Sequence, residues 1–271
     1  MQRIHAIEIH EQPGCPPVLR DGLTDVLQLA NRWLGVDRVV AAPLAEALAR
    51  TGDRRVVDLC SGGTGPWLWL QRRLEARLGR PVEVLLTDRF PSLTGRQRVA
   101  ASGRGTLTYP EAPVDATAVP RGLGGFRTMF NAFHQFQPDE ARMILADAVA
   151  ARRGIAVVET LSRHPLDLVH SLVLPLVVPV LALLARPFSW GRLLFTFVVP
   201  VLPLAVAFDA FVSCLRTYDR AELGALVESL GDVGYDWSFG SAWMIPGIAR
   251  AHWLVGVPRE AGARDASASV D

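Results

Sequence analysis

The chain has 271 residues, which suits one large domain or one domain with a sizeable insertion. Its net charge of +1 removes the electrostatic case for nucleic-acid binding, so we expect no nucleic-acid partner. Half of the residues are hydrophobic, and the excess is concentrated in one stretch described below. The three cysteines lie far apart without Cys-x-x-Cys spacing, which argues against a metal site and against a disulfide framework.

Residues 1–20 contain the breaker cluster Pro-Gly-Cys-Pro-Pro and predict an irregular segment. Charged residues among the first thirteen and the lack of an apolar core there argue against a secretory signal, so we expect a cytoplasmic protein. Apolar residues then recur at helical spacing over 21–34, and a second helix is expected over 39–50. These helices should pack on the sheet that follows them.

The most informative stretch covers residues 56–67. It begins as an apolar, β-branched run typical of a buried strand, passes into Cys-Ser-Gly-Gly-Thr-Gly-Pro, and leads into a helical pattern that ends near Leu78. Such a turn can hold a nucleotide, because glycine lets the backbone approach a ligand and the helix start offers free N–H groups. The stretch lacks the Lys-Ser/Thr of a P-loop and the G-x-G-x-x-G spacing of a dinucleotide site. A tight turn without a ligand is the alternative.

A second strand, expected over 82–88, follows that helix, so the two strands should form a parallel βαβ unit. Asp88 ends the second strand, roughly 25 residues beyond the glycines, near the spacing of a ribose-binding acid. A carboxylate there can accept hydrogen bonds from both ribose hydroxyl groups. An Asp at a strand end is also a common cap or turn residue.

The D-x-x-x-G-G-x-G pattern of this turn resembles the first motif of the class I S-adenosylmethionine-dependent methyltransferases. The resemblance implies S-adenosyl-L-methionine as cofactor and an α/β fold of three αβα layers, Rossmann-like, with a seven-stranded, mostly parallel sheet and an antiparallel closing strand. It also implies methyl transfer by in-line displacement, in which a general base is optional because the sulfonium leaving group is already activated. The cofactor-binding residues that it implies are Asp58, Ser61, Gly62, Gly63, Gly65, Asp88, Asp115, Ala116 and Asn131.

The next strands follow at the spacing that this fold requires. A third strand is expected over 106–109. Beyond it, Asp115 and Ala116 stand where the resemblance implies residues that contact the adenine of the cofactor. The alternative is that Asp115 is an ordinary polar loop residue. A fourth strand is expected over 127–131, ending at Asn131, which the resemblance places beside the transferred methyl group. In the loop after it, His134 is either a general base or a structural residue that donates to the backbone. A helix from 137 to about 152 and a fifth strand over 154–160 complete this part.

Residues 161–208 depart from the family pattern, because a hydrophobic helical hairpin replaces one short helix. Its apolar runs cover 166–185 and 193–208; the first is borderline for the ~20 residues of a membrane span and the second is shorter. If both crossed, the loop with Arg186 and Arg192 would lie on the far side, against the positive-inside tendency. We therefore expect membrane contact through 166–208, with these arginines and Trp190 at headgroup level. An apolar lid, a dimer interface and a double crossing are the alternatives.

Globular patterning returns after the hairpin. Residues 209–218 should connect it to a capped helix over 219–230, followed by strands over 235–241 and 251–257. Arg216 and Tyr218 either line the substrate crevice or anchor a loop. The methyltransferase domain would comprise 21–160 and 209–258, and 259–271 would be a disordered tail.

The order of these features predicts a methyltransferase that uses S-adenosylmethionine and acts on a hydrophobic or membrane-associated small molecule. A Rossmann-type oxidoreductase is disfavoured, because the chain lacks G-x-G-x-x-G and, having no Lys, any Tyr-x-x-x-Lys pair. A non-catalytic membrane-associated module that keeps the fold is the other alternative. The lack of Lys beside many Arg and Ala suggests a GC-rich bacterial genome.

Overall fold

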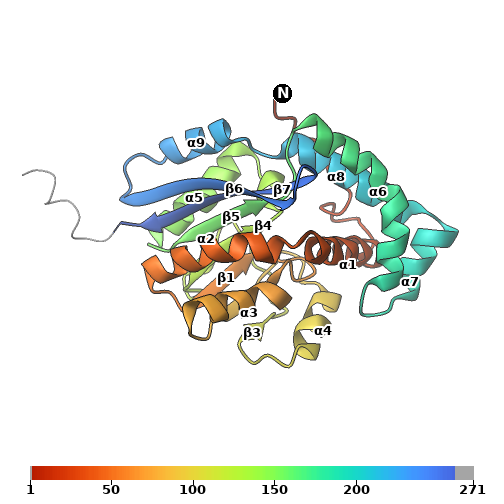
Figure 1. Cartoon of the computed structure of the whole chain (residues 1–271), viewed down its shortest axis with the longest axis horizontal. Helices are drawn as coiled ribbons and strands as arrows, with labels where there is room; N and C mark the ends of the chain where they lie inside the picture. The colour runs from red at the N-terminus through yellow and green to blue at the C-terminus, as the bar shows by residue number, and fades with distance from the viewer. Residues whose placement is uncertain (1, 260–271) are drawn as a thin grey trace, which may run out of the picture.

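The computed structural model describes residues 2–259 and arranges them around one seven-stranded sheet (Figure 1). The strand order is β3-β2-β1-β4-β5-β7-β6, and only β7 runs against the other strands. This confirms the predicted fold class, including the antiparallel strand inside the sheet. The strands are β1 Arg55–Leu59, β2 Glu83–Leu86, β3 Leu107–Thr108, β4 Phe126–Phe130, β5 Ile155–Glu159, β6 Tyr235–Ile245 and β7 Ala249–Pro258.

Helices cover both faces of the sheet, which is why every residue of β4 and β5 is buried. One face packs against α2 (Val36–Thr51) and α3 (Trp67–Leu78). The other packs against α5 (Pro138–Ala150) and α9 (Arg220–Glu228). The result is the expected three-layer αβα arrangement, visible in Figure 1.

Three helix boundaries differ from the sequence-based expectation. Helix α1 (Pro17–Leu34) begins four residues earlier, with Pro17 in the first turn, where a missing N–H group costs nothing. Helix α4 (Leu93–Ala101) was not predicted; Ser92 caps it by accepting a hydrogen bond from the Gly95 N–H. Helix α8 (Val201–Arg216) continues to residue 216, so most of the expected connection over 209–218 is helical. The predicted tail lies outside the described residues from position 260 onward.

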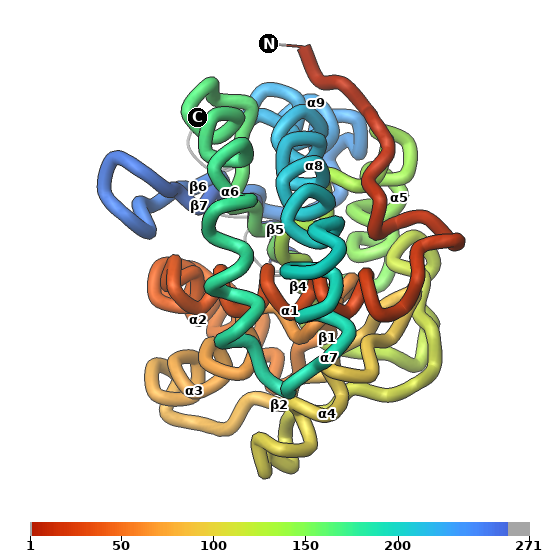
Figure 2. Tube along the Cα trace, turned by 90° about the vertical axis from the view of Figure 1, so that its right-hand side faces the viewer, coloured from red at the N-terminus to blue at the C-terminus, as the bar shows by residue number. Residues whose placement is uncertain are grey.

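The apolar hairpin consists of α6 (Pro165–Leu184), α7 (Trp190–Leu193), a π-helical turn (Leu194–Val198) and α8. Helices α6 and α8 lie side by side (Figure 2) and share a third apolar core with α1. Leu23 and Val26 of α1 meet Val178 and Leu181 of α6 and Leu202 of α8 in this core. One side of the hairpin is therefore packed on protein, and the opposite side is left exposed.

Among the described residues, α6 is long and apolar enough to cross a membrane, and only 22% of its most apolar stretch is buried. The second half of the hairpin is long and apolar enough only if α7, the π-helical turn and α8 together form one span. That half bends by 86° at its break. The bend and the burial of α8 against α1 argue against two straight crossings.

Arg192 does not take the position expected from the sequence. Its guanidinium is buried and pairs with Asp25 of α1, whose other carboxylate oxygen pairs with Arg98 of α4. Arg192 also donates to three carbonyl groups of the hairpin. It therefore fastens the hairpin loop to α1 instead of reaching lipid headgroups, whereas Arg186 and Trp190 are exposed.

Replacing Asp25 with Ala should lower the free energy of unfolding by about 3–5 kcal/mol, because two buried guanidinium groups would lose their carboxylate. Urea unfolding followed by circular dichroism measures this loss. Glu46→Ala is the matched control, since Glu46 is an exposed carboxylate on α2, and should change stability by no more than ~0.5 kcal/mol. Similar small losses in the two variants would contradict the role given to Asp25.

Candidate active site where the strand order reverses

The candidate site lies between the loops that follow β1 and β4. From β1 the chain moves through β2 to β3 in one direction, whereas from β4 it moves through β5 in the other. Ligands of open parallel sheets bind outside the carboxyl ends of the strands at such a reversal. The two loops concerned are the glycine turn over 60–66 and the segment around the 3-10 helix η1 (Phe133–Gln135).

The glycine turn has a left-handed backbone at two of its glycines. Gly62 and Gly65 both have φ of 49°, in the left-handed region that glycine adopts without a steric penalty. Asp58 fixes the turn from below: Ser61 Oγ donates to its Oδ2 at 2.6 Å and Thr128 Oγ1 to its Oδ1 at 2.7 Å. Burial raises the pKa of Asp58 to about 7. The side chains of Asp58 and Ser61 thus point into the turn, so their contribution to cofactor binding would come through its shape.

Asp88 lies directly beside this turn. Its Oδ2 accepts a hydrogen bond from the Gly62 N–H at 2.8 Å and its Oδ1 accepts one from the Phe90 N–H at 2.7 Å. The carboxylate is half-buried, and burial raises its pKa. Each oxygen keeps a second lone pair, which is what a pair of ribose hydroxyl groups would use.

The loop with Asp115 and Ala116 adjoins the same strand end, because the Val114 N–H donates to the Asp88 carbonyl at 2.9 Å. Asp115 is exposed, and hydrogen bonds from the Thr117 hydroxyl and N–H lower its pKa. Ala116 is buried in the core beneath. Asp115 therefore stands ionised at the rim, on the β2 side of the glycine turn.

Helices α1 and α4 enclose the glycine turn closely. A Cβ atom on Gly63 would lie 3.1 Å from the Thr24 carbonyl oxygen of α1. Tyr109 donates from its hydroxyl to the Gly62 carbonyl at 2.9 Å, and Arg98 of α4 donates to the Gly63 carbonyl at 3.2 Å. Gly63 is thus needed for packing against α1, so its substitution would disturb the fold as well as any ligand.

Asn131 joins three elements at the end of β4. Its backbone is left-handed, with φ of 50°. Its Oδ1 accepts hydrogen bonds from the N–H and hydroxyl of Thr160 at 2.8 and 2.9 Å, and its Nδ2 donates to Asn31 of α1 at 3.2 Å. The amide therefore holds the ends of β4 and β5 against α1, on the side of the site opposite Asp88.

His134 is buried between two carboxylates. Its Nδ1 lies 2.9 Å from Glu159 Oε2, and its Nε2 lies 3.4 Å from Glu8 Oε1. Burial opposes the charged ring, but Glu159 and Glu8 outweigh it and raise the pKa of His134 to about 10. An imidazolium with both nitrogens engaged has no lone pair for a substrate proton. The geometry therefore argues against the general-base role and favours the structural alternative.

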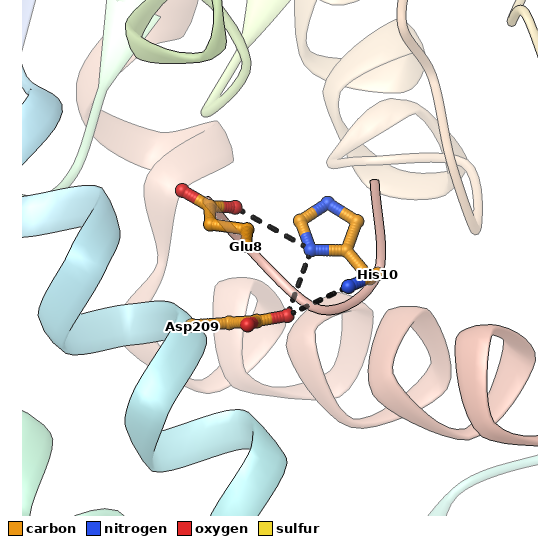
Figure 3. Close-up of side chains that lie close together, drawn as sticks. All are labelled: Glu8, His10 and Asp209. Carbon is orange, nitrogen blue, oxygen red and sulfur yellow. Dashed lines mark hydrogen bonds and ion pairs between the residues drawn. The ribbon is translucent and has the colours of Figure 1, made fainter. Parts of the chain in front are cut away.

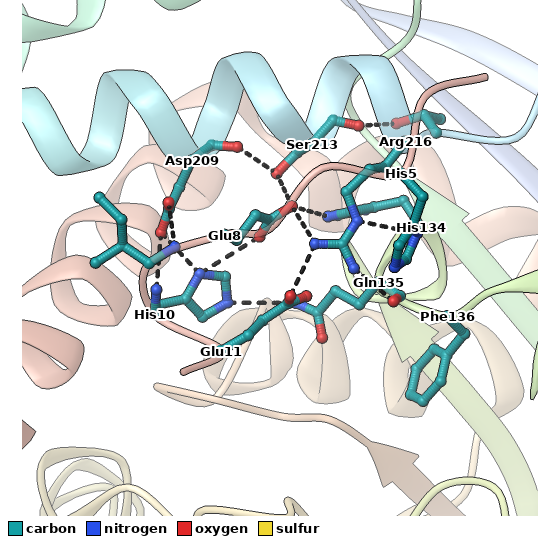
Figure 4. Close-up of polar contacts among 12 residues, drawn as sticks. His5, Glu8, His10, Glu11, His134, Gln135, Phe136, Asp209, Ser213 and Arg216 are labelled. Carbon is teal, nitrogen blue, oxygen red and sulfur yellow. Dashed lines mark hydrogen bonds and ion pairs between the residues drawn. The ribbon is translucent and has the colours of Figure 1, made fainter. Parts of the chain in front are cut away.

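Sequence reasoning missed a group of charged residues in the amino-terminal strap, defined here as residues 2–16 (Figure 4). Glu8 is fully buried, and its Oε1 accepts a hydrogen bond from Ser213 at 2.9 Å. Arg216 lies 3.4 Å from the same oxygen and pairs with Glu11 at 2.8 Å. Four titratable residues fall within positions 5–11, and that density was the available signal.

Arg216 and Tyr218 anchor the loop that follows β4. The Arg216 guanidinium donates to the carbonyl groups of His134 and Gln135, and the Tyr218 hydroxyl donates to the Phe136 carbonyl at 2.8 Å. Arg216 is almost fully buried. Of the two roles considered from sequence, these contacts match loop anchoring.

A cavity of about 430 Å³ lies beneath the neck of the apolar hairpin. Its wall is mostly apolar and comes from β5, β6, β7, α9 and η1. Glu159, whose carboxylate pairs with His134, forms part of the wall, and so does Ser162 at the start of the hairpin. The apolar lining consists mainly of Phe133, Val157, Tyr218, Leu223, Phe239 and Leu254. The cavity thus connects the hairpin neck with the buried charges above β5.

No protein-family model matches the chain, and neither does any curated protein. Among solved structures it is similar to the mitomycin 7-O-methyltransferase MmcR, with 17% identity over 91% of this chain and 58% of that one, at a TM-score of 0.47. It is similar to an O-methyltransferase family protein from Burkholderia thailandensis, with 14% identity over 84% of this chain and 57% of that one, at a TM-score of 0.48. It is also similar to human N-acetylserotonin methyltransferase in complex with SAM, with 14% identity over 87% of this chain and 56% of that one, at a TM-score of 0.48. This chain spans little more than half of these proteins. The fold assignment rests instead on the strand order and the reversed β7.

The charge on His134 predicts how stability depends on pH. Its folded pKa of about 10 lies above the ordinary 6.5, so its contribution is complete below pH 6.5 and disappears as the pH rises through about 10. The urea midpoint should therefore fall between pH 7 and pH 9.5 and fall less in His134→Gln. His170→Gln, on α6, should keep the wild-type slope. An unchanged slope in His134→Gln would show that the ring is not the charged group.

Proposed function

We propose that this chain is an S-adenosylmethionine-dependent methyltransferase whose acceptor is a hydrophobic or membrane-associated small molecule. The observation that carries the proposal is the hydrogen bond between Gly62 and Asp88 at the reversal of strand order. It sets a carboxylate beside a glycine backbone at the place where open α/β sheets bind nucleotides. The arrangement suits a nucleoside, whose ribose would lie on Asp88.

The residues around the turn fit such a cofactor. A Cβ atom on Gly65 would meet only Phe130, at 4.0 Å, so the backbone is accessible there. The Thr64 hydroxyl in the same turn is buried and makes no hydrogen bond within residues 2–259. We place the ribose on Asp88, the adenine beside Asp115 and Ala116, and the methyl group toward Asn131.

The cofactor, when bound, supplies a methyl group on a sulfonium leaving group. The task left to the chain is alignment of that methyl group with the acceptor. Because both ring nitrogens of His134 face carboxylates, this imidazole is not free to remove a proton.

The cavity under the hairpin neck supports an apolar acceptor. Its volume of about 430 Å³ falls in the range of small-molecule sites, and its wall combines apolar side chains with a few polar groups. Glu159 ends β5, so the cavity begins at the same edge of the sheet as the glycine turn. We infer that the apolar part of the acceptor occupies this cavity.

The exposed side of the hairpin supports membrane contact. Eighteen of the twenty-eight exposed large apolar side chains in the described residues lie between positions 166 and 208. Leu176 and Trp190 are 77% and 78% exposed, and Phe188 packs edge-on against Trp190. An apolar face of this extent marks a protein or membrane contact. Because the other side rests on α1, we infer that the hairpin lies in the membrane interface.

Asp88→Asn should weaken binding of S-adenosylmethionine at least tenfold, equivalent to about 1.4 kcal/mol, because the ribose loses a charged acceptor. Isothermal titration measures the affinity. Glu83→Gln, at the opposite end of β2, is the matched control and should bind as the wild type does. Thermal midpoints of both variants separate lost binding from lost folding. Equal affinities in folded Asp88→Asn and wild type would refute this placement of the site.

We expect the exposed face of the hairpin to bind the protein to lipid vesicles. In flotation with phosphatidylcholine–phosphatidylglycerol vesicles, the wild type should rise with the lipid, whereas Leu176→Asp and Trp190→Asp should remain at the bottom. Met143→Asp is the control, because Met143 is a half-exposed apolar residue on α5, away from the hairpin. Flotation that persists in both hairpin variants would count against membrane contact, and a dimer seen by light scattering would favour a protein interface.

A further inference from the structure

Glu8, His10 and Asp209 meet between the amino-terminal strap and α8, outside the glycine turn. Figure 3 shows the three side chains pointing toward one another. One ligand atom from each lies within 4.8 Å of the other two. His10 Nδ1 lies 2.9 Å from Asp209 Oδ2 and 3.4 Å from Glu8 Oε2. These are oxygen and nitrogen atoms of the types that bind divalent metal ions.

The spacing of these atoms suits a shared metal ion. Imidazole nitrogen and carboxylate oxygen bind such ions at about 2.0–2.2 Å. Two ligand atoms at that distance from one ion, at angles between 90° and 110°, lie roughly 3.0–3.4 Å apart. The two distances from His10 Nδ1 lie close to this range. An ion held here would take the place of the hydrogen bond between His10 and Asp209.

Glu8 has one oxygen that the protein leaves without a hydrogen bond. Its side chain is 0% exposed; Oε1 accepts a hydrogen bond from Ser213, whereas Oε2 makes no hydrogen bond within residues 2–259 and lies 3.4 Å from His10 Nδ1. A buried carboxylate oxygen is costly when nothing completes its coordination. An ion bound by Glu8, His10 and Asp209 would complete it.

The charges in this region also leave room for a cation. The side chains that contact one another here comprise four carboxylates, one guanidinium and two imidazoles; they are Glu8, Glu11, Asp209, Glu159, Arg216, His10 and His134. The carboxylates outnumber the single guanidinium among these side chains, which favours binding of a cation.

Neighbouring groups already hold the ligands in place. Asp209 accepts hydrogen bonds from the N–H groups of Ile9 and His10, at 2.7 and 3.1 Å. The Gln135 amide nitrogen lies 3.3 Å from His10 Nε2. Rotation of this amide by 180° would place its oxygen there, so that His10 Nε2–H donates to it and the Nδ1 lone pair is free to bind metal.

We propose that Glu8, His10 and Asp209 bind one divalent transition-metal ion, which fastens the amino-terminal strap to α8. One imidazole with two carboxylates suits Zn²⁺ or Mn²⁺, whereas Ca²⁺ and Mg²⁺ prefer oxygen ligands alone. The ion would fix the position of Glu8, which in turn contacts His134 and Arg216. This site is independent of the proposed methyltransferase activity.

Titration of the full chain, stripped with chelator and dialysed, with Zn²⁺ and Mn²⁺ separately tests the proposal. The expected result is one ion per chain and, with saturating metal, a raised thermal midpoint. His10→Ala should bind at least tenfold more weakly and lose the rise in midpoint. His5→Ala is the matched control, because His5 belongs to the same strap but not to the three ligands, and should bind as the wild type does.

Glu8→Gln provides a second test and should weaken binding by at least the same factor. If Glu8→Gln fails to fold, His10→Ala decides, because His10 is partly exposed. The visible spectrum of the Co²⁺-loaded protein distinguishes coordination from loose surface association, since only bound Co²⁺ should give strong ligand-field bands that vanish in His10→Ala. Absence of saturable binding, or equal binding in His10→Ala and wild type, would overturn the site.

Discussion

The hydrogen bond from the Gly62 N–H to the Asp88 carboxylate is the contact on which the site depends. It joins the turn after β1 to the end of β2, and Asp58 holds the same turn from inside the sheet. Because glycines at 62 and 65 allow the left-handed backbone, the turn can form where the strand order reverses. Without this contact, the carboxylate and the glycine backbone would have no fixed relation, and the proposed nucleoside site would not be preformed.

Buried charges attach the unusual parts of the chain to this core. Asp25 binds Arg98 of α4 and Arg192 of the hairpin, so α1, α4 and the hairpin loop meet at one carboxylate. Glu8 plays a similar part for the strap, through Ser213 and Arg216 of α8. Removing one member of such a group leaves the others buried and uncompensated, which makes these attachments specific as well as strong. The hairpin can therefore expose a large apolar face without losing its position.

The sequence predicted what depends on local pattern. Strands were recognisable as apolar runs, and the glycine turn with Asp88 as a βα unit of ordinary length, so the sheet and one side of the site followed. The strap was not recognisable, because Glu8 and Ser213 are 205 residues apart in sequence. Arg192 was expected at the level of lipid headgroups, since nothing near it in sequence identifies Asp25. For the same reason His134 could be either a base or a structural residue from sequence, because Glu159 and Glu8 approach it only in the folded chain.

Isothermal titration of the wild-type chain in mild detergent with S-adenosylmethionine, S-adenosylhomocysteine and NADH tests the central claim most directly. We expect micromolar binding of the first two and no binding of NADH. Asp88 and the glycine turn suit a nucleoside, and the turn lacks the G-x-G-x-x-G spacing of a dinucleotide site. Binding of NADH alone would contradict the account in favour of an oxidoreductase. Binding of none of the three would contradict it in favour of a non-catalytic module that keeps the fold.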